Sequence, residues 1–391
     1  MPDRDVMRVV MQQSQAIAQP PNVRALPRAI QGPPMAAMDM GEPVAVVIPS
    51  YRVTRHILDV IAGIGPIVDR IYVVDDCCPD GSGNLVERRC DDPRVHVLRH
   101  AQNSGVGGAT MTGMRQAIAD GAAIIVKMDG DGQMDPAKLP LLVDVIRRGE
   151  ADYAKGNRFF DPANVRAMPA TRLIGNAGLS FLSKLSTGYW QSFDPTNGYF
   201  AIHADVARML PFDKIHQRYF FESDMLFRLS TFRARVVDVP MPAIYGDEVS
   251  HLNPARSILP FAAGHVRNFV KRIGYNYFLR DFSLASAQLL SGILLLAFGL
   301  IYGLLHFGVS ASGASAGVVM MAGLPVLLGI QFLLAFLAYD IQSSPDAALH
   351  PRIEAWADRK TSQPARKETE TCSETRTPQP TTNASPQRMT V

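Results

Sequence analysis

The chain is poor in cysteine and nearly balanced in charge, and each feature excludes classes of protein. Only four of its 391 residues are cysteine, with Cys77 and Cys78 adjacent and Cys90 and Cys372 isolated. No CxxC or Cys/His spacing indicates a zinc site or a disulfide framework, so a reducing cytosolic compartment is expected. The formal net charge of +3 argues against a nucleic-acid-binding protein and against an acidic solvating one.

Two nucleotide-binding fingerprints are also missing. The first predicted strand is not followed by GxGxxG, which excludes the dinucleotide site of a typical dehydrogenase, and no GxxxxGK[ST] of a P-loop occurs. A nucleotide diphosphate bound without either motif points towards a nucleotide sugar.

Both terminal segments lack the features of folded domains. The first forty or so residues have no uninterrupted apolar core of a signal peptide, and we expect residues 1–42 to form a disordered arm. Residues 341–391 end in sequence rich in Thr, Pro, Lys and Arg, and we expect a disordered tail there.

Between residues 43 and 250, apolar strand patterns alternate with helical ones. Such alternation predicts βαβ units and an α/β fold with a mostly parallel sheet. Helices are expected over 53–64, from a glycine-rich turn at 103–108 to about 120, and from Pro136 onward. The predicted strands are 44–48, 71–74, 95–98 and 123–128.

Polar residues follow three of these strands, and Asp129-Gly130-Asp131 is the most informative. Ligands of open α/β sheets bind at the carboxyl ends of strands. Two carboxylates there suit Mg²⁺ or Mn²⁺ held together with a substrate diphosphate, although Asp-Gly-Asp is also a common solvated turn. The other strand ends carry Pro49 with Tyr51 and Asp75 with Asp76, and the turn at 103–108 offers backbone amides to a phosphate.

Two segments, 285–305 and 316–339, are almost free of charge, and each is long enough to span a membrane. The alternative is a buried core hairpin of a soluble enzyme. The positive-inside rule predicts a hairpin within 284–340, with residues 43–250 and both termini in the cytoplasm. Its basic flanks are Arg267, Lys271, Arg272 and Arg280 before the first segment and Arg352, Arg359, Lys360, Arg366 and Lys367 after the second.

Two further segments are amphipathic. Within 251–283, basic and apolar residues alternate, as expected of a juxtamembrane helix on an anionic leaflet. Residues 166–187 could lie on a membrane surface or pack on the sheet, and packing on the sheet is the favoured interpretation.

Six short motifs then occur in a characteristic order. They are Val47–Tyr51, Val73–Asp76 with Asp80–Ser82, Asn103–Gly107, Met128–Gln133, Gly156–Arg158 and Thr196–Phe200. With these motifs, residues 44–250 resemble the family 2 glycosyltransferases of GT-A fold, and most of all the dolichol- and polyprenol-phosphate mannose or glucose synthases.

The resemblance implies roles for individual residues. Asp129, Asp131 and Gln133 would hold the metal, which neutralises charge on the leaving nucleotide diphosphate. Arg158 would meet an acceptor phosphate, because a guanidinium fork matches phosphate geometry. Asp76 would contact the base or ribose of the donor. The residues implied in donor binding are Pro49, Tyr51, Asp76, Asn103, Gly105 and Asp129.

Glu222 and Asp224 lie where many family members keep a catalytic carboxylate. A hydroxyl acceptor needs a base during inversion, whereas a lipid phosphate is already an anion and needs none. Asp224 is slightly favoured over Glu222. The chain departs from the family after Pro-x-Tyr, where Arg52, Val53 and Thr54 replace the frequent Asn and Glu, and contacts made by that pair elsewhere are in doubt here.

The expected function is inverting transfer of a sugar from a UDP-, GDP- or dTDP-sugar to undecaprenyl or dolichyl phosphate at the cytoplasmic membrane face. The alternative enzyme uses a hydroxyl acceptor of a glycolipid or polysaccharide, although the Gln-x-x-Arg-Trp of processive members is absent. A non-catalytic membrane scaffold is disfavoured because both carboxylates of the Asp129–Asp131 pair are present. No nucleic-acid partner is expected, and a homo-oligomer is compatible with the sequence.

Overall fold

The computed structural model describes residues 41–160, 170–194, 197–241, 254–306 and 314–355. The chain divides into two compact units, Met1–Glu42 and Pro43–Val391, and the second holds every helix and strand described. The expected N-terminal arm lies almost wholly outside the described residues, as does the tail beyond residue 355.

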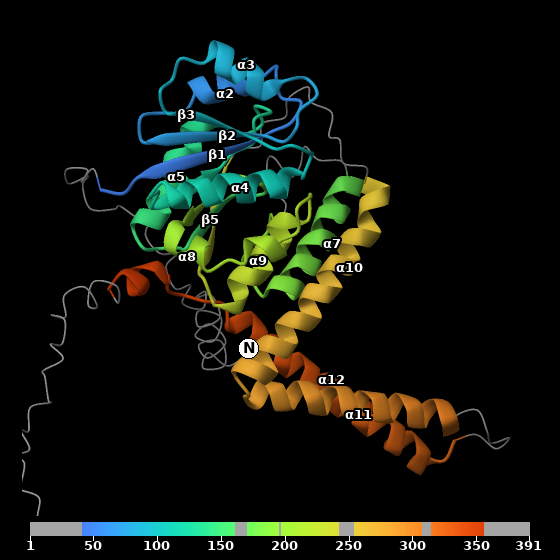
Figure 1. Ribbon diagram of the computed structural model, residues 1–391. Coiled ribbons are helices and arrows are strands. Elements are labelled where there is room, and N and C mark those ends of the chain that lie inside the picture. Colours follow the sequence, from blue (N-terminus) through green and yellow to red (C-terminus); the bar gives the residue numbers. More distant parts are fainter. Residues whose placement is uncertain (1–40, 161–169, 195–196, 242–253, 307–313, 356–391) are drawn as a thin grey trace, which may run out of the picture. The chain divides into compact units, whose positions relative to one another are not determined.

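A seven-stranded sheet forms the centre of the larger unit, with strand order β3-β2-β1-β4-β6-β5-β7 (Figure 1). β6 runs antiparallel to both β4 and β5, and the other neighbours are parallel. The strands are β1 (Val44–Ser50), β2 (Arg70–Asp75), β3 (Val95–Arg99), β4 (Ile124–Lys127), β5 (Tyr153–Asn157), β6 (Phe200–His203) and β7 (Val236–Pro240). The four expected strands and the mostly parallel α/β sheet are therefore confirmed, and β5, β6 and β7 are additions.

Helices cover both faces of this sheet, which explains the apolar runs. In β1, Val44, Val46 and Ile48 pack with α2 (Ile57–Ala62), α3 (Ser82–Arg89) and α5 (Leu139–Arg147). Ala45 and Val47 point to the other face and pack with α4 (Val106–Ala119), α8 (Ala204–Arg208) and α9 (Phe221–Thr231). A strand buried on both faces needs apolar residues at successive positions. Short 3₁₀ helices occupy η1 (Pro136–Lys138) and η2 (Phe212–Lys214).

The helices α7 (Ala170–Thr187) and α10 (Pro254–Ile273) lie side by side, and α7 contacts α9 and α10. The described part of residues 166–187 therefore packs mainly against α10 and α9, and the interpretation that this segment packs on the sheet is not supported. A π-helical segment, η3 (Gly274–Arg280), continues α10 towards the next helix.

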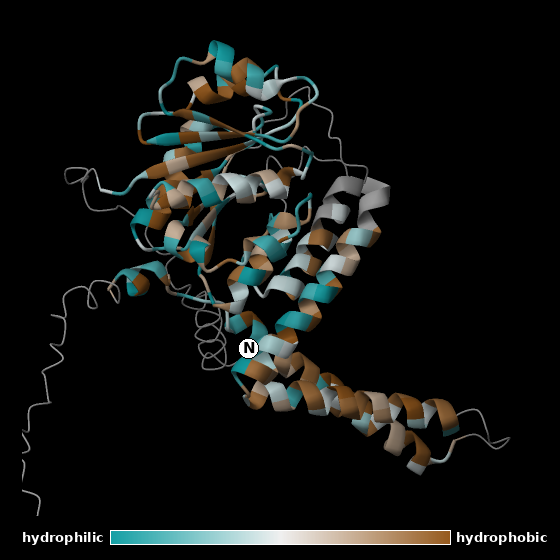
Figure 2. Ribbon diagram, viewed as in Figure 1, coloured by the Kyte–Doolittle hydropathy of each residue, from teal (hydrophilic) through white to brown (hydrophobic). Residues whose placement is uncertain are grey.

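Two long helices, α11 (Leu284–His306) and α12 (Ala316–Gln342), form an antiparallel pair of membrane-spanning length and composition. Most of their apolar side chains are not buried, unlike those of a core hairpin, and both helices are strongly hydrophobic along their length (Figure 2). Glycines permit close packing: a Cβ on Gly329 would lie 2.8 Å from the backbone nitrogen of Leu296. Small residues at the interface are typical of helix pairs in membranes.

A buried polar cluster attaches the hairpin to the rest of the unit. Asp340, near the end of α12, forms an ion pair with Arg272 of α10, whose Nη1 lies 2.6 Å from Oδ1. The same carboxylate accepts hydrogen bonds from Tyr277 (2.6 Å) and from Trp190 Nε1 (2.8 Å). Both ends of the hairpin are thus held on the side of the α/β part of this unit, residues 43–241.

The expectation of a disordered tail from residue 341 is wrong as far as residue 355. α12 continues to Gln342, and the segment after it returns to the sheet. The fully buried carboxylate of Asp152 accepts hydrogen bonds from the backbone nitrogens of Leu349 and His350, and it also pairs with His350 Nδ1. Polar composition misled the prediction because a few groups anchor this segment: backbone amides on Asp152, and the side chains of Leu349 and Ile353, which pack against the core.

Candidate active site

A cavity of about 470 Å³ opens at the carboxyl ends of β1, β2 and β4, a volume usual for a small-molecule site. The residues predicted for donor and metal binding all line this cavity: Pro49, Tyr51, Asp76, Asn103, Gly105, Asp129, Asp131 and Gln133. The convergence follows from the topology, because the carboxyl ends of parallel strands meet at one edge.

Asp76 shapes the cavity by holding the glycine-rich turn. Its Oδ1 accepts from the Ser104 nitrogen (2.8 Å) and pairs with His100 Nδ1 (2.7 Å), and its Oδ2 accepts from the Gly105 nitrogen (2.7 Å). Gly105 has φ +87°, a conformation that favours glycine. Since protein groups already engage both oxygens of this buried carboxylate, the geometry favours a positioning role over the direct base or ribose contact expected from the sequence.

The Asp129–Asp131 pair follows β4 in a tight turn. Asp131 Oδ1 accepts from the Gln133 nitrogen (3.0 Å), and Gly132 between them has φ +78°. Asp129 Oδ1 lies 2.7 Å from Nζ of Lys127, the last residue of β4. One edge of the cavity therefore presents carboxylate and amide oxygens beside a lysine ammonium.

Lys127 lines the cavity and was missed from the sequence, although a lysine closing the apolar run 124–126 was a visible signal. Its side chain is 1% exposed. A Cβ on Gly198 would collide with its Nζ and would lie 3.2 Å from Glu222 Oε1 and 3.3 Å from Asp129 Oδ2. Lys127, Asp129 and Glu222 thus converge at a point where only a glycine fits.

Glu222 and Asp224, two residues apart at the start of α9, point to different surroundings, as helix geometry requires. Glu222 lines the cavity, and burial raises its pKa to about 8, an effect that Asp129 reinforces and Lys127 opposes. Asp224 is not among the lining residues. Its buried carboxylate accepts from the His216 nitrogen (3.0 Å) and from Asn268 Nδ2 (3.1 Å). The slight preference for Asp224 as base is therefore not supported by its position.

Arg158 also lies outside the cavity lining. Its Nε and Nη2 bind the two carboxylate oxygens of buried Asp194, at 2.8 and 3.0 Å. Arg218 and Tyr219, which precede α9, do line the cavity and were not identified from the sequence. Among the described residues, no carboxylate forms an ion pair with Arg218. Only the three-dimensional path of this loop brings that guanidinium to the site.

Comparisons with known proteins place this geometry in a family. Residues 45–210 match the family model of glycosyl transferase family 2. The undecaprenyl-phosphate mannosyltransferase of Micrococcus luteus is 32% identical over 202 residues, which cover 51% of this chain and 82% of that protein. The chain is a family 2 glycosyltransferase.

Two further proteins are similar to this chain, one in sequence and one in structure. The UDP-N-acetylglucosamine–dolichyl-phosphate N-acetylglucosaminyltransferase of Methanococcus voltae is 29% identical over 216 residues, covering 52% of this chain and 86% of that protein. A solved structure of glucosyl-3-phosphoglycerate synthase from Mycobacterium tuberculosis, in complex with Mn²⁺, UDP-glucose and phosphoglyceric acid, has a TM-score of 0.46 and 18% identity, covering 63% of this chain and 86% of that one.

The oxygen-bearing side chains at this edge of the cavity suit a divalent cation. Asp129, Asp131 and Gln133 all line the cavity and offer the hard oxygen ligands that Mg²⁺ and Mn²⁺ prefer. The sequence prediction of a metal site is consistent with this placement. Lys127 already supplies a cation to Asp129, so a metal ion would share that carboxylate with the ammonium.

Proposed function

We propose that the chain transfers a sugar, with inversion, from a nucleotide-sugar donor to the phosphate of a polyprenyl lipid at the cytoplasmic membrane face. The observation that carries the proposal is one continuous arrangement. The donor cavity includes Arg218 and Tyr219, and the next residue, Phe220, contacts Phe261 and His265 of α10. α10 in turn leads through η3 into the membrane hairpin.

The proposed chemistry uses few protein groups. Arg218 would bind the acceptor phosphate, and Asp129, Asp131 and Gln133 would hold Mg²⁺ or Mn²⁺ on the donor diphosphate. When bound, the metal supplies positive charge for the leaving group. A phosphate oxygen bonds to the anomeric carbon as the bond from that carbon to the nucleoside diphosphate breaks on the opposite face. The acceptor is already an anion, so no residue has to remove a proton.

The amphipathic helices support a position at the membrane surface. In α10, the polar residues His265, Asn268 and Arg272 are buried against the protein, while the apolar residues Leu259, Val266 and Val270 are 78%, 60% and 63% exposed. α7 shows the same inversion. Its serines Ser180, Ser183 and Ser186 are buried, and Phe181 is 54% exposed. Outward apolar faces on neighbouring helices are suited to a lipid interface.

The attachment of both hairpin ends supports the proposed topology. Arg272 before α11 binds Asp340 at the end of α12. The segment that follows α12 binds Asp152 of the catalytic unit, by which we mean the α/β part of the chain, residues 43–241. Both flanks of the hairpin therefore lie on the same side as the catalytic unit, and by the positive-inside rule the basic residues in those flanks favour the cytoplasm for this side.

One observation favours a second candidate function, transfer to a hydroxyl acceptor. Glu222 lines the donor cavity beside Asp129 and could remove the acceptor proton. In that case Glu222, rather than Asp224, would be the base.

The test uses the full chain in detergent with Mg²⁺ or Mn²⁺ and a panel of UDP-, GDP- and dTDP-sugars, with and without undecaprenyl phosphate. We expect nucleotide release that requires both metal and acceptor, and a glycosylated lipid phosphate as product. Asp131→Asn should abolish both the nucleotide release and the lipid product. Metal-dependent release without a lipid-phosphate product would favour the hydroxyl-acceptor function, and wild-type turnover by Asp131→Asn would contradict the metal assignment.

A further inference from the structure

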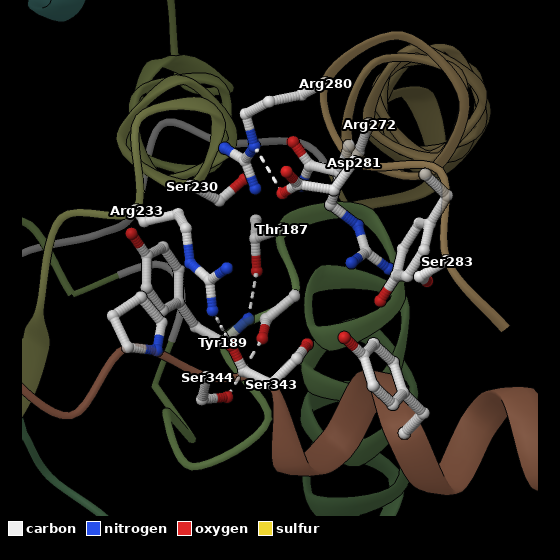
Figure 3. A pocket seen from close by; sticks show the side chains of 15 residues that line it. Thr187, Tyr189, Ser230, Arg233, Arg272, Arg280, Asp281, Ser283, Ser343 and Ser344 are labelled. Carbon is white, nitrogen blue, oxygen red and sulfur yellow. Dashed lines mark hydrogen bonds and ion pairs between the residues drawn. The ribbon is translucent and has the colours of Figure 1, made fainter. Parts of the chain in front are cut away.

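A second cavity lies where the hairpin joins the catalytic unit, and it shares no lining residue with the donor cavity. Its walls come from the ends of α7, α9 and α10, from η3 and the residues between it and α11, and from the end of α12 (Figure 3). Its volume of about 50 Å³ leaves room for a few water molecules or one phosphate-sized group. A nucleotide or a whole sugar would not fit.

Three arginines, Arg233, Arg272 and Arg280, contribute to this cavity (Figure 3). Arg272 is neutralised by its buried ion pair with Asp340. Arg280 pairs at 3.0 Å with Asp281, which also lines the cavity and is 59% exposed, and its Nη1 donates to the Thr231 carbonyl at 2.7 Å. Arg233 forms no ion pair with any carboxylate among the described residues. The cavity therefore keeps an excess of positive charge.

The backbone position of Arg233 makes this guanidinium notable. It follows α9 in a left-handed conformation with φ +61°. Its nitrogen binds the Ser230 carbonyl (3.2 Å), and the Ala234 nitrogen binds the Leu229 carbonyl (3.1 Å). This pattern is the Schellman motif, whose left-handed position normally takes glycine. The arginine accepts backbone strain here, while its Nη2 reaches the Ser343 carbonyl after α12 at 3.1 Å.

Further polar side chains line the cavity. Oδ1 of Asn276, at the cavity wall, is buried and has no hydrogen-bond partner. The Ser283 hydroxyl also lines it. The hydroxyls of Ser230 and Ser344 do so too, but they already donate to the backbone carbonyls of Phe227 (2.7 Å) and Gly188 (3.3 Å). Guanidinium and hydroxyl donors are the groups that bind phosphate oxygens, and the amide of Asn276 can pair with a hydroxyl or amine next to that phosphate.

We propose that this cavity is a phosphate-binding site, occupied by the phosphate of an anionic membrane lipid headgroup or by free phosphate. The lining residue Ser283 immediately precedes α11, Tyr339 lies in the last turn of α12, and Ser343 follows that helix. Once the hairpin spans a bilayer, the cavity lies at the depth of the headgroups, where basic pockets beside membrane helices bind lipid phosphates. A bound phosphate bridges Arg233 of the catalytic unit and Arg280 of η3, and so fixes the hairpin to the catalytic unit.

The experiment measures thermal unfolding of the full chain in detergent with phosphatidylglycerol, phosphatidylcholine or sodium phosphate at constant ionic strength. Native mass spectrometry counts retained lipids. Arg233→Gly removes the guanidinium at a backbone position that suits glycine, so the variant is expected to fold. Arg280→Gln tests the other arm, and Arg89→Gln, an exposed arginine on α3, is the charge-matched control. Metal-dependent donor hydrolysis reports an intact catalytic unit.

We expect phosphatidylglycerol, but not phosphatidylcholine, to raise the unfolding midpoint by several degrees in the wild type and in Arg89→Gln. Arg233→Gly and Arg280→Gln should lose most of that shift and one retained lipid. A shift produced equally by millimolar phosphate would support the site and assign the free ion as its ligand. Equal shifts with both lipids, or full retention of the shift in both cavity variants, would overturn the proposal. Because the readout is binding, the result does not depend on which acceptor the enzyme uses.

Discussion

The ammonium of Lys127 lies 2.7 Å from Oδ1 of Asp129, so the first carboxylate of the Asp129–Asp131 pair is already bound to a cation. The lysine is 1% exposed and closes a strand that is otherwise apolar. Two unit charges about 4 Å apart interact by about 4 kcal/mol at an effective dielectric constant of about 20. A metal ion and this ammonium on one carboxylate therefore repel each other appreciably.

Replacing Lys127 by methionine should strengthen metal binding. Removal of the competing charge is expected to lower the half-saturating Mn²⁺ concentration about tenfold, equivalent to about 1.4 kcal/mol. Lys214→Met, at an exposed position, is the control. The measurement is donor hydrolysis against Mn²⁺ concentration, and an unchanged or higher half-saturating concentration in Lys127→Met would show that the two cations do not compete.

Glu222→Gln distinguishes the two acceptor chemistries. With a lipid-phosphate acceptor no base is needed, and kcat should fall less than about tenfold. A hydroxyl acceptor would lose about 10²- to 10⁴-fold, the usual contribution of a general base. Asp224→Asn serves as the comparison, because its carboxylate binds His216 and Asn268 outside the cavity. It should lower the unfolding midpoint while leaving the KM for the donor unchanged.

Arg218→Gln and Arg158→Gln should separate acceptor binding from stability. Arg218 lines the cavity, so its loss is expected to raise the KM for polyprenyl phosphate about tenfold, or about 1.4 kcal/mol. Arg158 binds buried Asp194, so its loss should instead reduce the free energy of unfolding by about 1–3 kcal/mol. Steady-state kinetics with varied acceptor, together with thermal unfolding, tests both. A raised KM for the acceptor in Arg158→Gln, with reduced stability in Arg218→Gln, would instead support Arg158 as the phosphate ligand.

Stability should fall in mild acid because buried histidines must become charged. Burial lowers the pKa of His265 to about 4, from 6.5. The stabilisation by the neutral form is complete above pH 6.5 and is lost as pH falls towards 4, by up to about 3 kcal/mol. His203 has a similarly lowered pKa and contributes in the same direction. The free energy of unfolding should depend less steeply on pH in His265→Asn than in His96→Asn, a control at an exposed position. Equal slopes would contradict the assignment.

The convergence of the predicted residues on one cavity could be predicted from the sequence, because the geometry of parallel strands leaves little choice. Asp76 follows β2 and Asp129 follows β4, the two strands that flank β1. Their convergence follows from strand direction alone. β5 was missed because its sequence, Tyr153 to Asn157, contains lysine, glycine and asparagine, although every residue in it is buried. Polar side chains in that strand are satisfied by distant partners, which a local pattern does not reveal.

The choice between similar residues required the structure. Glu222 and Asp224 lie on different faces of α9, and which face meets the cavity depends on how Phe221, Met225 and Leu229 of the same helix pack in the core. Arg158 and Arg218 both carry a guanidinium that suits a phosphate. Arg158, however, binds the carboxylate of Asp194, which lies 36 residues away in sequence. Such pairings depend on tertiary contacts and have no short-range signature.

The most direct test of the central claim compares undecaprenyl phosphate with undecaprenol, acceptors that differ only in the phosphate. The full chain, a divalent cation and the donor that supports nucleotide release are incubated with each lipid, and the product is identified by mass spectrometry. Transfer to polyprenyl phosphate predicts a glycosyl-phosphate lipid from undecaprenyl phosphate and no product from undecaprenol. Glycosylation of undecaprenol at a comparable rate, or no lipid product from the phosphate, would contradict the account.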